Sequence, residues 1–399
     1  APTACVFYDL GVEQIPFSTL VAYLIRLLLS VTGNYARPGG NVFASAFSPA
    51  AKFLSEKEMF RAPVSGVEAI AALGGFGMMP PNILPEEVEG DHPERIRAVI
   101  VEGANPLLSY ADTAAYRRAF AKLDLLVVID PAMTETARAA DYVLPAPVGY
   151  EKWEWSSFPN GYPEVFVQLR PPVVQGPEEA LPEAEIYARL AEATGVVAKT
   201  PAVLKALGRT ARAKIGGAAY QGAAAALAAI HGRGDKMGTM ARFLVWNYRA
   251  VGPHLPGAAA ASLWSLAHLV AMTRRGDVLR ALGDEVGDLK GLALGEAIFQ
   301  RILDHPEGVE VARVDPDRDY ERNCGFEDGR MRLAPEPMVR EMERALREPP
   351  VLPEGSFALY TGRRTHWNAN TIHRDPKWRK GKGPHFFAGM HPDDAARIG

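Results

Sequence analysis

Cysteine is nearly absent from this chain: Cys5 and Cys324 are the only two among 399 residues. They lie far apart and form no C-x-x-C pair. The chain's own cysteines are therefore too few to build an iron–sulfur cluster or a structural zinc site. The pattern indicates two reduced thiols in a protein of cytoplasmic type.

An excess of charge of one sign is also lacking. The 44 basic and 47 acidic residues leave a formal net charge of -3. This balance argues against nucleic acid or an anionic membrane as a general partner. With 48% hydrophobic and 23% charged residues, the composition is that of a soluble globular protein, long enough for two or three domains.

Long uninterrupted apolar runs are missing too. Residues 16–31 are interrupted by Arg26, and residues 256–273 are short, alanine-rich and contain His268. A membrane span needs about 20 apolar residues, so both segments are expected to be buried helices. The chain opens without Met, and both ends look like cuts in a longer protein. An export signal before residue 1 therefore stays open as an alternative to a cytoplasmic location.

Residues 95–145 give the clearest fold prediction. Strands are expected at Ile96–Val101, Leu125–Ile129 and Tyr142–Leu144, with Asp112 as the N-cap of an intervening helix. Continuous apolar strands joined by a helix predict an α/β fold with a parallel, doubly wound sheet. Further helices are expected at 17–31, 182–194, 217–230, 238–251 and 336–347. Further strands are expected at Ala4–Phe7 and Ser356–Tyr360, and 51–94 is expected to be a surface connector.

Polar residues follow the first of these strands in the segment "EGANPLLS". Gly103 and Asn105 predict a tight loop whose amides can face an anion, and Ser109 adds a hydroxyl. An ordinary Asn-Pro turn explains the same residues.

The next strand leads into "DPAMTETARAAD". Asp130 stands where a carboxylate can accept ribose hydroxyls or the N1–H and N2–H groups of guanine. Thr134 and Thr136 could donate to phosphate, and Asp141 could contact a ring or ribose. Alternatively, Thr134 and Asp141 only cap a short helix at about 134–140.

A third polar segment, "TGRRTHWNANTIH" at 361–373, combines two arginines, two histidines and two asparagines. Guanidinium groups suit phosphates and asparagine amides suit polar heterocycles, so a binding loop is predicted. The spacing of the two histidines is a poor metal signature.

Four segments come in the order and spacing typical of molybdopterin oxidoreductases: "GVEQ…TGNYARPGGNVF", "EGANPLLS", "KLDLLVVIDPAMTETARAADYVLPAP" and "TGRRTHWNANT". The chain resembles this superfamily, which includes dimethyl-sulfoxide reductases and formate dehydrogenases, over about 1–200 and 330–399.

The resemblance implies a domain order. Residues 1–50 would end a cofactor-binding region that carries the TGN-x-x-RPGG loop, and 51–200 would form the α/β dinucleotide-binding domain. Residues 201–350 would be a mostly helical insertion and linker. Residues 351–399 would start a β-barrel-like domain that binds the molybdopterin dinucleotide.

The resemblance also implies a set of cofactor-binding residues, drawn from the matching motifs. They are Gln14, Gly33, Asn34, Arg37, Gly39, Asn105, Pro106, Ser109, Asp130, Thr134, Thr136, Asp141, Gly362, Arg363, His366, Asn370 and Thr371.

The implied function is that of a fragment of the catalytic subunit of a molybdenum-dependent oxidoreductase. Its cofactor would be molybdenum bis(molybdopterin guanine dinucleotide), used for two-electron chemistry on a small-molecule substrate with an iron–sulfur electron-transfer partner. The family's cluster cysteines and metal ligand would lie upstream, because Cys5 comes too late in the pattern. No residue here is assigned to catalysis or to a metal. Two alternatives are a non-catalytic structural subunit of a respiratory complex and a nucleotide-binding α/β transferase.

Overall fold

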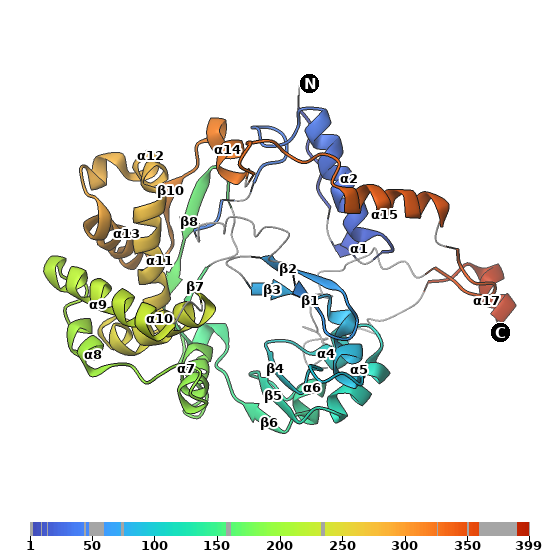
Figure 1. Ribbon diagram of the computed structural model, residues 1–399, viewed down its shortest axis with the longest axis horizontal. Coiled ribbons are helices and arrows are strands. Elements are labelled where there is room, and N and C mark those ends of the chain that lie inside the picture. The colour runs from blue at the N-terminus through green and yellow to red at the C-terminus, as the bar shows by residue number, and fades with distance from the viewer. Residues whose placement is uncertain are drawn as a thin grey trace. The chain divides into compact units, whose positions relative to one another are not determined.

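The computed structural model describes residues 3–8, 10–13, 15–43, 45–47, 60–72, 76–156, 161–232, 236–324, 326–348, 351–358 and 389–398 (Figure 1). The chain divides into two compact units. One comprises Ala1–Cys5 and Leu29–Arg332, and the other comprises Val6–Leu28 and Leu333–Gly399.

A three-stranded parallel sheet in the first unit confirms the central fold prediction. Its strands are β4 (Ala98–Glu102), β5 (Leu125–Ile129) and β6 (Tyr142–Leu144), in that spatial order. Helices α4 (Pro106–Ser109) and α5 (Thr113–Ala121) lie between β4 and β5 in the chain, and α6 (Glu135–Ala139) lies between β5 and β6. Asp112 caps α5 as predicted, because its Oδ1 accepts the Ala115 N–H at 2.9 Å.

The two faces of this sheet are covered unequally. On one face, Val101 and Val128 pack against Tyr116 and Phe120 of α5 and against α6. On the other face, α7 (Glu183–Ala193) covers the carboxyl end of β5, where Ile129 and Ile186 share a small core. This second face is covered only in part, because Ile100 is 47% exposed.

The prediction that 51–94 is a plain connector is wrong for the described part of that segment. It contains the antiparallel strands β1 (Phe60–Arg61), β2 (Glu68–Ala72) and β3 (Phe76–Met78), then η2 (Pro81–Ile83) and α3 (Leu84–Glu89). Glu87 of α3 is fully buried and accepts the N–H groups of Ser65 at 2.6 Å and Val64 at 3.2 Å. Burial alone would raise the pKa of Glu87, but these hydrogen bonds hold it below its ordinary value.

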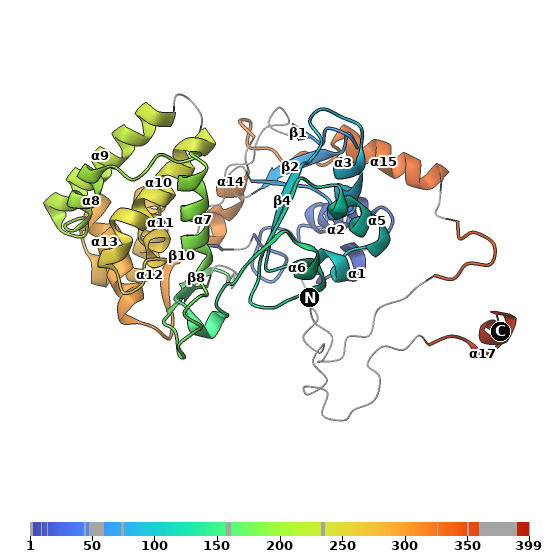
Figure 2. The same cartoon turned by 90° about the horizontal axis from the view of Figure 1, so that it is seen from below.

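The first unit also contains a helical layer (Figures 1 and 2). Its helices are α8 (Ala202–Gly208), α9 (Lys214–Gly232), α10 (Lys236–Ala250), α11 (Ala260–Thr273), α12 (Arg275–Val286) and α13 (Gly291–Asp304). The predicted helices 217–230 and 238–251 correspond to α9 and α10. Glycine allows α8 and α10 to approach closely, because a Cβ on Gly208 would lie 2.1 Å from the Ala250 carbonyl oxygen of α10.

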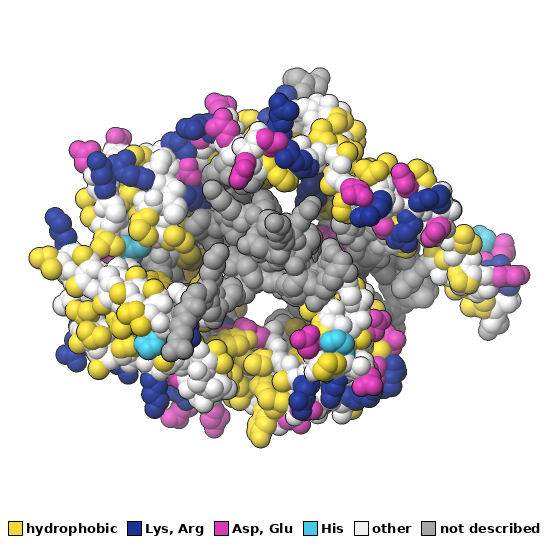
Figure 3. Space-filling model, in the orientation of Figure 1, with side chains coloured by type: hydrophobic (Ala, Val, Ile, Leu, Met, Phe, Trp, Pro, Cys, Tyr) yellow, Lys and Arg dark blue, Asp and Glu magenta, His cyan; other side chains and the backbone are white. Residues whose placement is uncertain are grey.

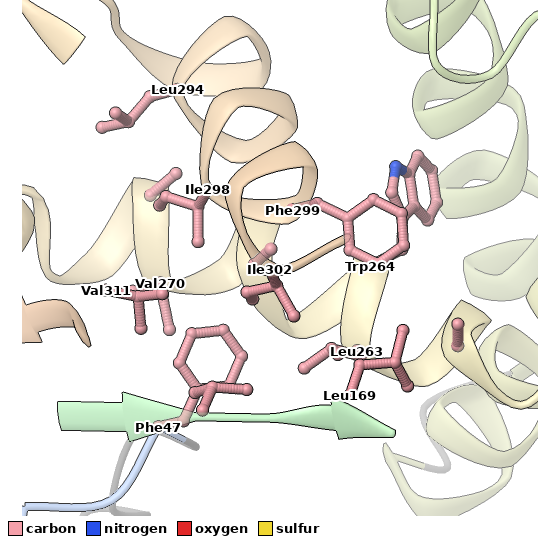
Figure 4. Packing of buried hydrophobic residues seen from close by; sticks show 14 of the residues in the cluster. Phe47, Leu169, Leu263, Trp264, Val270, Leu294, Ile298, Phe299, Ile302 and Val311 are labelled. Carbon is pink, nitrogen blue, oxygen red and sulfur yellow. The ribbon is translucent and has the colours of Figure 1, made fainter. Parts of the chain in front are cut away.

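Short strands border this layer. β8 (Glu164–Val167) pairs antiparallel with β10 (Val309–Arg313), and β7 (Glu154–Trp155) pairs with β9 (Leu169–Arg170). The remaining short elements are η3 (Gly149–Glu151), η4 (Gly252–His254), η5 (Pro316–Arg318) and α14 (Asp319–Asn323). Figure 4 shows the core between strand and helices, where Phe47 and Leu169 face side chains such as Ile302 and Phe299.

The second unit contains α1 (Leu10–Glu13), most of α2 (Ser18–Val31), α15 (Glu336–Arg347) and α17 (Pro392–Ile398). The Arg344 guanidinium of α15 lies 4.6 Å from the centroid of the Phe17 ring. Acidic and basic side chains alternate over α15 (Figure 3) and include the pair formed by Arg340 and Glu336. The predicted helix 336–347 is confirmed.

Three expectations near the ends of the chain need correction. No strand forms in the described residues 3–8, so the predicted strand Ala4–Phe7 is wrong. Residues 356–358 are not in a strand either, and the rest of the predicted barrel start lies mostly outside the described residues. The helix α2, expected to be buried, is buried only in part: Leu20 is buried, but Leu24 and Leu28 are 38% and 57% exposed. Within the described residues, no helix is long and apolar enough to cross a membrane.

Candidate functional site

Two loops leave the sheet at its carboxyl edge, one after β4 and one after β5. In folds of this kind ligands bind at that edge. Gly103 begins the first loop with φ +56, a conformation that glycine adopts without strain. Its N–H donates to the Ile129 carbonyl at 3.0 Å, which brings the starts of the two loops together.

Asp130 opens the second loop and is half-buried. Its Oδ1 accepts the Ala132 N–H at 2.8 Å, and its own N–H donates to Leu144 O at 3.3 Å. Among the described residues no second donor to this carboxylate is found. The turn therefore holds the carboxylate in place and leaves Oδ2 for an external donor.

The predicted hydroxyl donors in this loop have internal roles. Thr136 is fully buried, and its hydroxyl donates to Asn105 Oδ1 at 2.8 Å. Thr134 caps α6, where its Oγ1 accepts the Ala137 N–H at 3.1 Å. The alternative that Thr134 caps a short helix is confirmed, and the Thr136 hydroxyl hydrogen is used within the chain.

Asp141 lies at the opposite edge of the sheet. Its Oδ2 accepts the Leu126 N–H at 2.7 Å, and its N–H donates to the Leu126 carbonyl at 2.9 Å. Leu126 is near the start of β5 and Asp130 follows its end, so about 13 Å of strand separates them. Asp141 thus lies away from Asp130, and its carboxylate holds the beginning of β5; its contact with a ring or a ribose stays a prediction.

The other predicted residues of the first loop belong to α4 or precede it directly. Asn105 is 7% exposed and Pro106 is buried as the first residue of the helix. Ser109 is exposed, and its N–H donates to Asn105 O at 2.9 Å. The amides of Ala104 and Asn105 have no acceptor within the described parts of the chain, as the predicted amide-lined loop requires.

Residues 32–41 form a compact loop closed on itself. Gly33 and Gly39 adopt positive φ values of +67 and +82. Asn34 donates through Nδ2 to Thr32 Oγ1 at 3.1 Å and accepts the Ala4 N–H through Oδ1 at 2.9 Å. Arg37 accepts the Gly40 N–H through its carbonyl at 3.1 Å, which helps to close the turn. The remaining predicted residues, namely Gln14, Gly362, Arg363, His366, Asn370 and Thr371, lie outside the described residues.

The electrostatics of the sheet edge favour donors over anions. Between 102–112 and 130–141 the chain places Glu102, Asp130 and Glu135 near the strand ends, with Arg138 as the one cation. Tyr187 of α7 donates its hydroxyl to Glu102, and burial together with that carboxylate raises the pKa of Tyr187. Nowhere in the described chain do three His, Cys, Asp or Glu side chains group as metal ligands would.

Sequence reasoning did not single out Glu135 or Glu102. Glu135 accepts the Asn105 Nδ2–H at 2.7 Å, which links residues 30 positions apart. An acidic residue at the first position of a helix is common, so this position carries no signal for such a contact. Only the parallel arrangement of β4 and β5, which places Asn105 beside α6, shows it.

The sheet and its helices define an α/β domain, and ligands of such domains bind at the carboxyl edge of the sheet. Comparison with known proteins then identifies it: residues 11–193 match the family model described as molybdopterin oxidoreductase. The predicted resemblance is confirmed over residues 11–193, which contain three of the four motifs. This family implies a molybdopterin cofactor.

Several known oxidoreductases are similar to this chain over part of their length. The chain is 30% identical over 209 residues to F420-dependent formate dehydrogenase 2 subunit alpha of Methanococcus maripaludis, covering 49% of this chain and 30% of that protein. It is 28% identical over 191 residues to formate dehydrogenase H of Escherichia coli, covering 43% and 26%. It is 36% identical over 101 residues to trimethylamine-N-oxide reductase of Haemophilus influenzae, covering 25% and 12%.

A solved structure also matches. Acetylene hydratase from Pelobacter acetylenicus aligns with a TM-score of 0.38 and 21% identity, over 47% of this chain and 29% of that one. The matched region spans less than a third of the first two relatives, at 30% and 26% of their lengths.

Proposed function

We propose that this chain is part of the catalytic subunit of a molybdenum-dependent oxidoreductase and that its carboxyl sheet edge binds the guanosine end of molybdopterin guanine dinucleotide. The observation that carries the proposal is the Asp130 carboxylate. It is fixed through Oδ1 to the Ala132 N–H at the end of β5, with Oδ2 available. The family match over residues 11–193 supplies the cofactor class.

The residues at this edge fit a nucleoside. A carboxylate can accept the guanine N1–H and N2–H groups together. The backbone at Gly103 is also open, because a Cβ built on it meets no atom within 4 Å. The acidic character of the edge suits the donor groups of a purine and its ribose better than a diphosphate.

Diphosphate binding is therefore assigned to arginines of other loops. Arg37 in the 32–41 loop and Arg363 in the third polar segment are the candidates that the motifs provide. When bound, the molybdenum–pterin group would supply two-electron redox chemistry to a small substrate, with an iron–sulfur protein as electron partner. The residues of this chain bind and orient the nucleotide end.

The test is Asp130→Ala with Asp124→Ala as the matched control. Asp124 stands at the other end of β5, where it pairs with Arg97 and its side chain is 47% exposed. Losing a charge-assisted contact to guanine costs about 1.5–3 kcal/mol, or roughly 10- to 100-fold in affinity. Guanine nucleotide and molybdenum released from purified protein would be quantified for both variants.

We expect guanine content to fall in Asp130→Ala and to stay at the wild-type level in Asp124→Ala. Equal content in both variants would remove Asp130 from the site. A wild-type protein without guanine nucleotide or molybdenum would instead favour the non-catalytic structural subunit.

A further inference from the structure

We infer that Glu135 is a positioning residue for nucleotide binding, which acts by holding the Asn105 side chain and, through it, the loop that carries Asp130. The inference rests on the proposed function of this edge. It assigns a role to a carboxylate that no sequence pattern singles out.

The Asn105 side chain joins the two loops. Its Nδ2 donates to Glu135 Oε2 at 2.7 Å, and its Oδ1 accepts both the Thr136 N–H at 3.1 Å and the Thr136 hydroxyl at 2.8 Å. Thr136 Oγ1 in turn accepts the Leu107 N–H at 3.2 Å. We call these four hydrogen bonds the loop clamp.

The loop clamp is buried, which makes each of its bonds costly to lose. Asn105 is 7% exposed and Thr136 is fully buried. An amide left without partners in such a place costs about 1–3 kcal/mol. Glu135 provides the single charged acceptor, and hydrogen bonds to charged groups are stronger than those between neutral groups.

The loop clamp limits the freedom of Asp130. The segment from Asp130 to Thr134 is fixed at its start, where the Asp130 N–H donates to Leu144 O at 3.3 Å. At its other end Glu135 and Thr136 are held to Asn105. Releasing that end frees the turn that orients the carboxylate. The Asn105 side chain therefore positions this turn.

Two substitutions at one position separate contact from charge. Glu135→Gln keeps an oxygen that can accept from Asn105 and removes the charge. Glu135→Asp keeps the charge but shortens the side chain by one methylene, so it no longer reaches Nδ2. Asn105→Ala removes the other partner. Arg138→Gln is the control, because it changes an exposed charge on the same helix, α6.

The measurement is calorimetric titration of the 399-residue chain with GDP, and with CDP as the comparison nucleotide, well below the melting temperature of each variant. We expect Glu135→Asp and Asn105→Ala to weaken GDP binding on the order of tenfold. Glu135→Gln and Arg138→Gln should bind within about twofold of wild type. The double variant Glu135→Asp/Asn105→Ala should bind no more weakly than Asn105→Ala, because the two residues act as one unit.

Each outcome decides a separate point. Loss of binding in Glu135→Gln with wild-type binding in Glu135→Asp would overturn the positioning role in favour of a charge effect. Wild-type GDP binding in both Glu135→Asp and Asn105→Ala would overturn it as well. If the wild-type chain fails to prefer GDP over CDP, the proposed function fails instead. If Asn105→Ala does not fold, the two Glu135 variants still decide.

Discussion

A single methyl group added to Gly295 should disrupt the helical core. Gly295 of α13 faces His268 of α11, and a Cβ built on it would lie 2.2 Å from the imidazole Nδ1. His268 is 4% exposed, and its Nε2 lies 3.2 Å from Glu296 Oε1. The ring has nowhere to move without losing that contact, so Gly295→Ala must shift a helix or the imidazole.

The expected cost follows from these contacts. Overpacking in a tight core costs about 1–3 kcal/mol. Displacing the imidazole would also disturb Glu296, which accepts hydrogen bonds from the Trp264 indole and, at 3.1 Å, from the Arg212 guanidinium. We therefore expect Gly295→Ala to lower the free energy of unfolding by about 2–3 kcal/mol, the upper part of that range.

The assay is urea unfolding followed by tryptophan fluorescence. Trp264 is a suitable reporter, because its ring centroid lies 4.7 Å from that of His268. Gly222→Ala in α9 is the control, since a Cβ there meets nothing within 4 Å. Alanine in an open helix interior should stabilise by about 0.5–1 kcal/mol. If Gly295→Ala unfolds at the same urea concentration as Gly222→Ala, the close approach between α11 and α13 is wrong.

Two further predictions concern charged groups of the helical layer. Burial alone would raise the pKa of Glu296, but hydrogen bonds from its imidazole, indole and guanidinium neighbours hold that pKa below its ordinary value of 4.5. A carboxylate whose pKa is depressed in the folded state stabilises the fold at pH values above its unfolded-state pKa. This contribution is lost as the pH falls through its folded-state pKa. The stability difference between wild type and Glu296→Gln should therefore shrink below about pH 4.5 in urea titrations, and a constant difference down to pH 3 would contradict this. Arg249 forms ion pairs with Glu185 at 2.6 Å and Glu192 at 3.1 Å, and its side chain is 21% exposed. Arg249→Leu should therefore lower the free energy of unfolding by about 2 kcal/mol, measured from the midpoint of urea unfolding. A midpoint equal to that of the wild type would show that these pairs contribute nothing.

Local sequence signals predicted the sheet well. Leu125–Ile129 is a continuous apolar run, and four of its five residues are buried, so its bounds were predictable to the residue. Asp112 was recognisable as an N-cap because its carboxylate precedes a periodic apolar face. Signals of this kind need only neighbouring residues.

The features that the sequence did not predict correctly depend on contacts between residues far apart in the chain. Glu68–Ala72 reads EAIAA, a sequence with low strand propensity, and it forms β2 because it pairs with β3. The apolar stripe on α2 contains enough leucines for more than one face, so periodicity did not select the buried one. The loop clamp joins Asn105 to Glu135 and Thr136, which lie 30 and 31 positions further along the chain, and it depends on the parallel order of β4 and β5.

The two aspartates of "DPAMTETARAAD" show how topology decides between roles that look alike in sequence. Asp130 follows the end of β5, and Asp141 precedes the start of β6. Because β5 and β6 are parallel, the end of one and the start of the other lie at opposite edges of the sheet. Asp141 therefore anchors the Leu126 amide at the amino edge, and Asp130 alone faces the edge where ligands of such sheets bind. The same argument applies to any parallel strand pair joined by a short helix: of two polar residues that bracket the connection, the first is the candidate for ligand binding, and the second is the candidate for holding the sheet.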